Sequence, residues 1–420
     1  MASPASTTRT SWRAAWQPDM THPPIPAATR ETCDECSKNL EAARKLVLHA
    51  EISQDPAVRA QGLYLLQMLQ AFGFNIYVAP RQAYPNFYLH SIFMPFESGF
   101  GAPCPDFFYR WAFLDGKRSY RIRGKQGTTR WIEFQAHKGF WGDPDQGHLG
   151  NHDLDSFNID ADGRYEIIAS PDRHEGNWIP LDPSRSNIVM MVREAWYDWD
   201  RERGAEFHIE AIDLKGDEPM AIDETEMNRR TLAVSRLVKF YVEFFQGLNK
   251  RIDDGVGRNQ FYFTPPRSAD NVGGNPRAAY MQMIYDIAPG DALIVETEIP
   301  QARYWSIQMN DMWWQTTDYT HHQSSLNGHQ AHLDADGRVR MIICREDPGV
   351  PNWIDPVNPG IGIAQWRWYL SDRHPVPSVT KVGVNEVRAH LRSGTPHVTP
   401  AQRREAIAQR RRAVQARYGF

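Results

Sequence analysis

The period of the apolar positions changes along the chain. Between residues 31 and 74 large apolar side chains recur every three or four positions, which predicts two helices. Thr32 with Glu35, and Asp55 with Pro56, are residue types that begin helices. Later, short apolar and aromatic runs alternate with turn signals such as Asp115-Gly116, and this pattern predicts antiparallel β structure.

A long helix is predicted between two such β regions. Asp223 and Glu226 can cap this helix, and one apolar face continues through Lys250. The chain should end in a last helix that Thr399-Pro400 begins. We therefore expect a flexible arm (1–30), an N-terminal helical region (31–74), a first β-sandwich domain (75–214), a linking helix and loop (215–276), a second β-sandwich domain (277–372) and a C-terminal helical tail (373–420).

The two β regions repeat one another in sequence. Asp160–Arg164 reads the same as Asp334–Arg338, and in each copy an Asn-Trp pair follows. Trp131–Gln135 corresponds to Tyr304–Gln308 upstream of these motifs. The predicted fold class is mainly β with helical additions: two related β-sandwich or jelly-roll-like domains from an internal duplication, plus N-terminal, linking and C-terminal helices.

Composition narrows the class of protein and of partner. Hydrophobic residues make up 41% and charged residues 23% of the 420, as in a globular protein. The net charge of −4 gives none of the basic excess of a nucleic-acid binder, and no apolar stretch is long enough to span a bilayer. The start of the chain contains no apolar segment of signal-peptide type, so we expect a cytoplasmic protein without nucleic-acid or membrane partners. Apolar stripes on the helices predict a homo-oligomer.

The fingerprints of several enzyme classes are absent. The chain has no GxSxG elbow, no P-loop, no HExxH and no GxGxxG after a strand, so no nucleotide cofactor is predicted. The densest polar and aromatic stretch is 308–332. In the strand before it, alternation places Tyr304, Gln308 and Asn310 on one face. That face either contacts water or lines a pocket, and Gln135 at the step equivalent to Gln308 indicates a structural bond common to both copies.

The histidines of this stretch suggest acid–base chemistry, because imidazole titrates near neutral pH. A divalent metal in the loop from His321 to His332 is a lesser alternative, since adjacent histidines in extended chain point to opposite faces. Arg193 and Arg367, at corresponding strands, either bind a carboxylate or tie a strand to an acidic neighbour. The predicted catalytic residues are His321, His322, Asp318 and Tyr304, and the predicted substrate-binding residues are Gln308, Asn310, Trp313, Trp314, Asn327 and Arg367.

Two functions fit these residues. The first is an enzyme independent of nucleotide cofactors, a lyase, dehydratase, isomerase or hydrolase, that uses His/Asp/Tyr chemistry on a small organic substrate. The second is a non-catalytic module that binds carbohydrate or aromatic ligands on Trp and Tyr side chains. We favour the enzyme, because two full domains with helices exceed what a simple binding module needs. A closed pocket containing a histidine would favour catalysis, and an open row of indoles would favour binding.

The repeated units also resemble a known pair of families. The motifs that carry the resemblance are Tyr304-Trp305, Asn310, Leu326-Asn327, Asp334–Gly337, Asp347–Gly349 and Asn352-Trp353 in the second unit, and Gly176–Pro180 in the first. On these motifs the second unit resembles the domain-of-unknown-function 1214 family, and the first is similar to the 1254 family, together over about residues 80–372. The resemblance implies two β-sandwich or jelly-roll-like domains with helical additions, and it implies no particular reaction.

Overall fold

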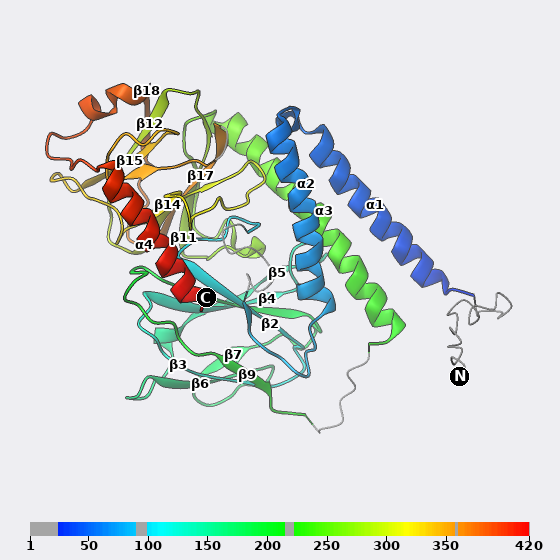
Figure 1. Cartoon of the computed structure of the whole chain (residues 1–420). Helices are drawn as coiled ribbons and strands as arrows, with labels where there is room; N and C mark the ends of the chain where they lie inside the picture. Colours follow the sequence, from blue (N-terminus) through cyan, green and yellow to red (C-terminus); the bar gives the residue numbers. More distant parts are fainter. Residues whose placement is uncertain (1–23, 90–98, 215–221, 358–359, 420) are drawn as a thin grey trace, which may run out of the picture.

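The computed structural model describes residues 24–89, 99–214, 222–357 and 360–419. Figure 1 shows two β domains, one above the other, with long helices along one side. In the first domain a five-stranded sheet has the order β1 (Tyr88–Leu89), β2 (Phe107–Leu114), β8 (Ile188–Ala195), β4 (Trp131–Lys138) and β5 (Gly147–Asp153). Its second sheet has the order β7 (Trp178–Pro180), β6 (Arg164–Ser170), β3 (Tyr120–Lys125) and β9 (His208–Ala211).

The second domain repeats this topology strand for strand. Its five-stranded sheet has the order β10 (Tyr262–Thr264), β11 (Ala278–Asp286), β17 (Ile361–Ser371), β13 (Ala302–Asn310) and β14 (Ser325–Asn327). The four-stranded sheet has the order β16 (Trp353–Ile354), β15 (Arg338–Ile343), β12 (Asp291–Glu298) and β18 (Ser378–Gly383). The predicted fold class is therefore confirmed, as is the internal duplication.

Two strands lie where the sequence analysis placed none. Strand β10 lies in the segment predicted to be a connecting loop, and β18 lies in the predicted helical tail. Both are edge strands with largely exposed or half-buried side chains, so neither carries the apolar alternation that reveals a strand. The predicted boundary between the second β domain and its flanking segments was wrong at these two strands.

Both faces of each five-stranded sheet are covered. One face packs on the four-stranded sheet of the same domain, where apolar clusters fill each sandwich. The other face packs between the domains, in a cluster that includes Phe107, Trp131, Tyr280, Tyr304 and Tyr369. The expectation that the polar face of β13 could contact water was therefore wrong, because the other domain covers it.

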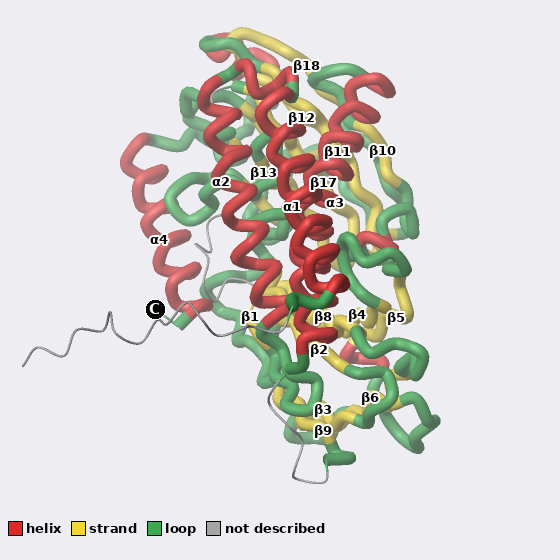
Figure 2. Tube along the Cα trace, turned by 90° about the vertical axis from the view of Figure 1, so that its right-hand side faces the viewer, coloured by secondary structure: helices red, strands yellow, loops and turns green. Residues whose placement is uncertain are grey.

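Three helices form a layer beside the domains: α1 (Ala27–His49), α2 (Pro56–Gly73) and α3 (Glu224–Val256) (Figure 2). Asp55 and Asp223 cap α2 and α3 as predicted, each accepting a backbone N–H. Helix α1 begins at Ala27, before the predicted capping box at Thr32 and Glu35, because Pro26 and two alanines allow an earlier first turn. The predicted arm is thus helical from residue 27, and residues 1–23 lie outside the described part.

The apolar stripes of these helices pack on one another and on the β domains in one cluster. The homo-oligomer stays a prediction. Shorter helical turns lie at Glu51–Gln54, Phe74–Val78, Leu154–Ser156, Asp270–Val272 and Val384–His390. Within the described residues, none of the helices combines the length and the apolar character needed to cross a membrane.

The basic C-terminal segment is helix α4 (Pro400–Tyr418), which the predicted capping box of Thr399 and Gln402 begins. Arg403, Arg410 and Arg417, spaced seven residues apart, are all buried against the body of the protein. Arg403 lies over the Trp353 ring of the second domain, and Arg417 lies over rings of the first. These arginines therefore hold the two domains together, and Figure 1 shows α4 crossing from one domain to the other.

Candidate functional site

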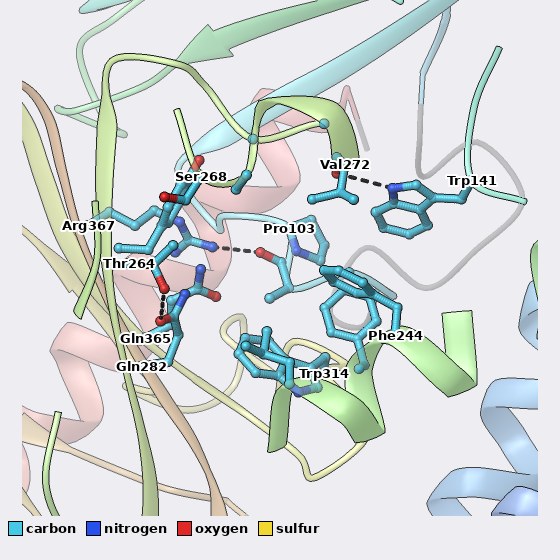
Figure 3. Close-up of a pocket in the computed structure, with 18 of the residues that line it drawn as sticks. Pro103, Trp141, Phe244, Thr264, Ser268, Val272, Gln282, Trp314, Gln365 and Arg367 are labelled. Carbon is cyan, nitrogen blue, oxygen red and sulfur yellow. Dashed lines mark hydrogen bonds between the residues drawn. The ribbon is translucent and has the colours of Figure 1, made fainter. Parts of the chain in front are cut away.

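A cavity of about 330 Å³ lies between the two five-stranded sheets and helix α3. The segment after β10 forms part of its wall and is fixed to the first domain, where Trp141 Nε1 donates to the carbonyl of Val272 at 3.0 Å. Figure 3 shows polar side chains on one side of the cavity and aromatic rings on the other. The polar side chains come from the second β domain, and the aromatic rings include Trp141, Phe244 and Trp314.

Two arginines line the cavity at equivalent positions of the duplicated sheets. Arg193 on β8 pairs in register with Tyr109 of β2, and Arg367 on β17 pairs in register with Tyr280 of β11. Each arginine is only 3% exposed. The two copies therefore bring two buried cations and their tyrosine neighbours to one cavity.

Arg193 is neutralised within the protein. Its register partner on β4 is Glu133, which is 0% exposed and forms an ion pair with it. The side-chain amides of Asn151 and Asn275 also donate to the Glu133 carboxylate. Burial raises the pKa of Glu133, and the Arg193 guanidinium opposes that rise. This half of the duplicated pair is a satisfied structural ion pair.

Arg367 has no such partner. The position on β13 that corresponds to Glu133 is occupied by Ser306. Arg367 donates to Gln308 Oε1 and, at 2.6 Å, to the carbonyl of Ala102, and it forms no ion pair with any carboxylate of the described residues. A buried cation bound only to neutral groups is costly unless an anion completes its surroundings. Of the two buried arginines of the duplicated sheets, Arg367 is therefore the one whose positive charge no carboxylate of the described residues compensates.

A row of polar side chains lies beside Arg367. Gln282 and Gln365, which pair in register on β11 and β17, both line the cavity. Gln282 Oε1 accepts a hydrogen bond from Thr264 at 2.9 Å, whereas Gln365 Oε1 is buried without a partner. The equivalent positions of the first domain, Trp111 and Met191, also line the cavity but are apolar. At these two paired positions the second domain is therefore polar and the first apolar.

Only one tryptophan of the predicted pair reaches the cavity. Trp314 lines it and has a positive φ of 63°, while Trp313 packs against α2 and donates to the Val58 carbonyl at 2.7 Å. Asp311 holds this turn by accepting the backbone N–H groups of Trp313 and Gln315, each at 2.9 Å. Burial raises the pKa of Asp311 to about 7. The turn that shapes this wall is therefore held by a carboxylate that titrates near neutrality.

The predicted acid–base residues lie elsewhere. His321 Nδ1 is 2.9 Å from Asp318 Oδ2, and His322 Nδ1 is 2.7 Å from Asp355 Oδ2. The two imidazoles are 50% and 41% exposed, and neither lines the cavity. Tyr304 is fully buried, where its hydroxyl contacts Asp106 and Cys104. The four predicted catalytic residues therefore do not form one site.

The predicted binding residues divide in the same way. Arg367 and Trp314 line the cavity. Gln308 lies behind Arg367 and accepts a hydrogen bond from it. Gln135 accepts from Arg193 in the same way, at 2.9 Å. The predicted structural bond common to both copies is therefore confirmed. Asn310 accepts from Gln308 at 2.7 Å, and Asn327 donates to the buried Asp106 at 2.7 Å.

No metal centre is evident in the described residues. No group of three or more His, Cys, Asp or Glu side chains there could hold a metal ion. His329 and His332 each face a single aspartate, Asp198 and Asp334. The loop from His321 to His332 therefore does not gather a ligand set in this arrangement.

Several cavity residues were missed from the sequence. Gln282, Gln365 and Tyr280 lie on strands β11 and β17, and Phe244 lies on α3. The duplication carried a signal for one of them, because Tyr280 stands at the place that Tyr109 occupies in the first copy. The position of α3 over the seam between the domains leaves no such trace in the sequence.

Comparison with known proteins agrees with this architecture. Residues 111–194 match the family model described as a protein of unknown function (DUF1214), and residues 258–333 match the model for DUF1254. The predicted resemblance is thus correct for the two families but wrong in their order. The two units share their short motifs. These motifs therefore identify the pair of families, but they do not tell which unit belongs to which family. No curated protein matches the chain.

One solved structure supports the fold. A crystal structure of an uncharacterized protein from Burkholderia cenocepacia is 26% identical, covers 87% of this chain and 100% of its own, and has a TM-score of 0.79. A Vibrio parahaemolyticus protein is 11% identical over 82% of this chain and 100% of its own, with a TM-score of 0.44. The first of these shows that the whole two-domain arrangement occurs in another protein.

Proposed function

We propose that the protein binds a small organic anion, a carboxylate with an apolar body, in the cavity between its β domains. The observation that carries the proposal is Arg367, a 3% exposed cation that lines the cavity and forms no ion pair with the described carboxylates. A guanidinium fork suits the two oxygens of a carboxylate. A ligand carboxylate would pair with Arg367 as the Glu133 carboxylate pairs with Arg193.

The rest of the cavity supports an apolar ligand body. Its volume of about 330 Å³ lies at the small end of ligand pockets. Trp141, Phe244 and Trp314 supply rings against which an aromatic or aliphatic group can pack. None of the His, Asp or Glu side chains in the described residues lines the cavity, so its groups suit binding better than the predicted acid–base chemistry.

Calorimetric titration with 3-phenylpropionate and its neutral amide tests the proposal. We expect the carboxylate to bind at least about tenfold more tightly than the amide, since a charged hydrogen bond contributes about 1.5–3 kcal/mol. Arg367→Met should remove this preference. Arg251→Met is the matched control, because Arg251 lies at the cavity but is exposed and should change the affinity less than about threefold. Equal binding of the acid and the amide to the unaltered protein would reject the proposal.

The acid–base enzyme remains a second candidate. The observation in its favour is that His321 and His322 each have an oriented carboxylate partner, Asp318 and Asp355. An enzyme of this kind would need a substrate site at the exposed surface beside these pairs. If His321→Ala, His322→Ala and Asp318→Ala all left turnover of an identified substrate unchanged, this candidate would fail. A cytoplasmic location is retained as a prediction, to be tested by cell fractionation.

A further inference from the structure

A row of three glutamines crosses the five-stranded sheet of the second domain. Gln282 of β11 pairs in register with Gln365 of β17, which pairs in turn with Gln308 of β13. Gln282 and Gln365 line the cavity, and Figure 3 shows both beside Arg367. In the first domain the positions equivalent to these two carry Trp111 and Met191. Gln282 and Gln365 therefore belong to one copy of the duplicated sheet and are not required by the fold.

The three amides differ in how well they are satisfied. Gln308 accepts from Arg367 and donates to Asn310 at 2.7 Å, so it is a structural residue. Gln365 is 6% exposed, its Oε1 is buried without a partner, and its Nε2 forms no hydrogen bond within the described residues. A buried amide oxygen left unpaired is costly. An apolar residue here would avoid that cost, as Met191 does in the first copy.

Gln365 and Arg367 are two residues apart on one strand, so their side chains point to the same face of the sheet. Their Cα atoms are about 7 Å apart, from the rise of a strand per residue. A carboxylate bound to Arg367 therefore places the next few atoms of the ligand within reach of the Gln365 amide. The terminal torsion of a glutamine is broad, so either end of that amide can turn toward the cavity. The aromatic wall of Trp141, Phe244 and Trp314 remains for the apolar body.

From these positions we infer that the ligand carries, close to its carboxylate, a neutral group that both donates and accepts hydrogen bonds, and that Gln365 recognises it. This inference rests on the binding function proposed above. An amide presents one donor pair and one acceptor, so its complement is another amide or a hydroxyl. The ligand class is thus an N-acyl amino acid or a hydroxy acid with an aromatic or aliphatic side chain. Gln365 then sets specificity, and Arg367 supplies the attraction for the anion.

Three probes of similar shape test the inference by calorimetry: 3-phenylpropionate, 3-phenyllactate and N-acetylphenylalanine. We expect at least one of the two polar probes to bind the unaltered protein about five- to tenfold more tightly than 3-phenylpropionate. Gln365→Met keeps the side-chain length and should abolish this preference. The matched control is Gln301→Met, the same substitution at an exposed position outside the cavity, which should keep the preference.

The outcomes separate the inference from the function on which it rests. Tighter binding of 3-phenyllactate alone identifies a hydroxyl, and tighter binding of N-acetylphenylalanine alone identifies an amide. If 3-phenylpropionate binds in an Arg367-dependent way and neither polar probe is preferred, the inference is wrong and the binding function stands. A preference that survives Gln365→Met also overturns it. If none of the three carboxylates binds, both proposals fall.

Discussion

Arg193→Met and Arg367→Met should differ sharply in their effect on stability, although the two arginines hold equivalent positions and are equally buried. Methionine matches the aliphatic stem of arginine, so the main change at each site is the loss of a buried charge. The groups that lose their partner when the charge is removed differ between the two sites. This difference lets a stability measurement test which arginine is structural.

Removal of Arg193 strands Glu133. Its carboxylate is 0% exposed and would keep only neutral donors, the amides of Asn151 and Asn275. Breaking a buried ion pair by removing one partner typically costs about 3–5 kcal/mol, and we expect Arg193→Met to lie in that range. The double variant Glu133→Gln with Arg193→Met removes both charges and should recover a large part of this loss.

Removal of Arg367 strands no charge. Two acceptors lose their donor, Gln308 Oε1 and the Ala102 carbonyl, at about 1 kcal/mol each. Folding of the variant, however, no longer buries a cation that lacks an anionic partner. The desolvation of that cation costs a few kcal/mol in the unaltered protein. The two terms nearly cancel, so we expect Arg367→Met to change the free energy of unfolding by less than about 1.5 kcal/mol.

Urea denaturation followed by circular dichroism measures both variants against the unaltered protein in the absence of ligand. The comparison uses the midpoints at constant m, because a change in m would mean that the transition itself has changed. If Arg367→Met destabilises the protein as much as Arg193→Met, then Arg367 is a structural residue like its counterpart. In that case the argument from an uncompensated cation fails, and the proposed anion site loses its main support.

Three further predictions follow from single contacts. Ser306→Glu should give Arg367 an internal carboxylate like that of Arg193, so titration with 3-phenylpropionate should show at least about tenfold weaker binding. Burial raises the folded-state pKa of Asp311 from 3.8 to about 7, so the folded state binds the proton more tightly and stability should fall as the pH rises from about 4 to about 7. Asp311→Asn should lack that decline, and urea midpoints across this pH range check it. Gly62→Ala should destabilise by about 1–3 kcal/mol, seen as a lower Tm, because its Cβ would lie 2.8 Å from Trp313 Cε2.

The fold was accessible from the sequence because its main signals are local. Asn177 and Asn352, for example, each bond two backbone carbonyls at the same corner of their sandwich, and repetition of such corners reveals the duplication. Strand alternation also placed Gln308 and Asn310 on one face. The burial of that face could not be predicted from the sequence, because the surface that covers it belongs to the other domain. The sequence also did not show that His321 and His322 lie away from this cavity, because a dense polar loop need not lie near a cavity.

The position of the candidate site follows from how the two copies diverged. A duplicated sheet that packs against its own copy brings equivalent residues together, and here it doubles a buried arginine beside a tyrosine. Two identical copies would carry an internal carboxylate each and leave nothing for a ligand. Glutamate at one position and serine at the equivalent one leave one of the two buried arginines unpaired, at the seam where α3 and the segment after β10 complete a cavity. For a protein built from two copies, positions where only one copy satisfies its own buried polar groups are therefore the first places to test for ligand binding.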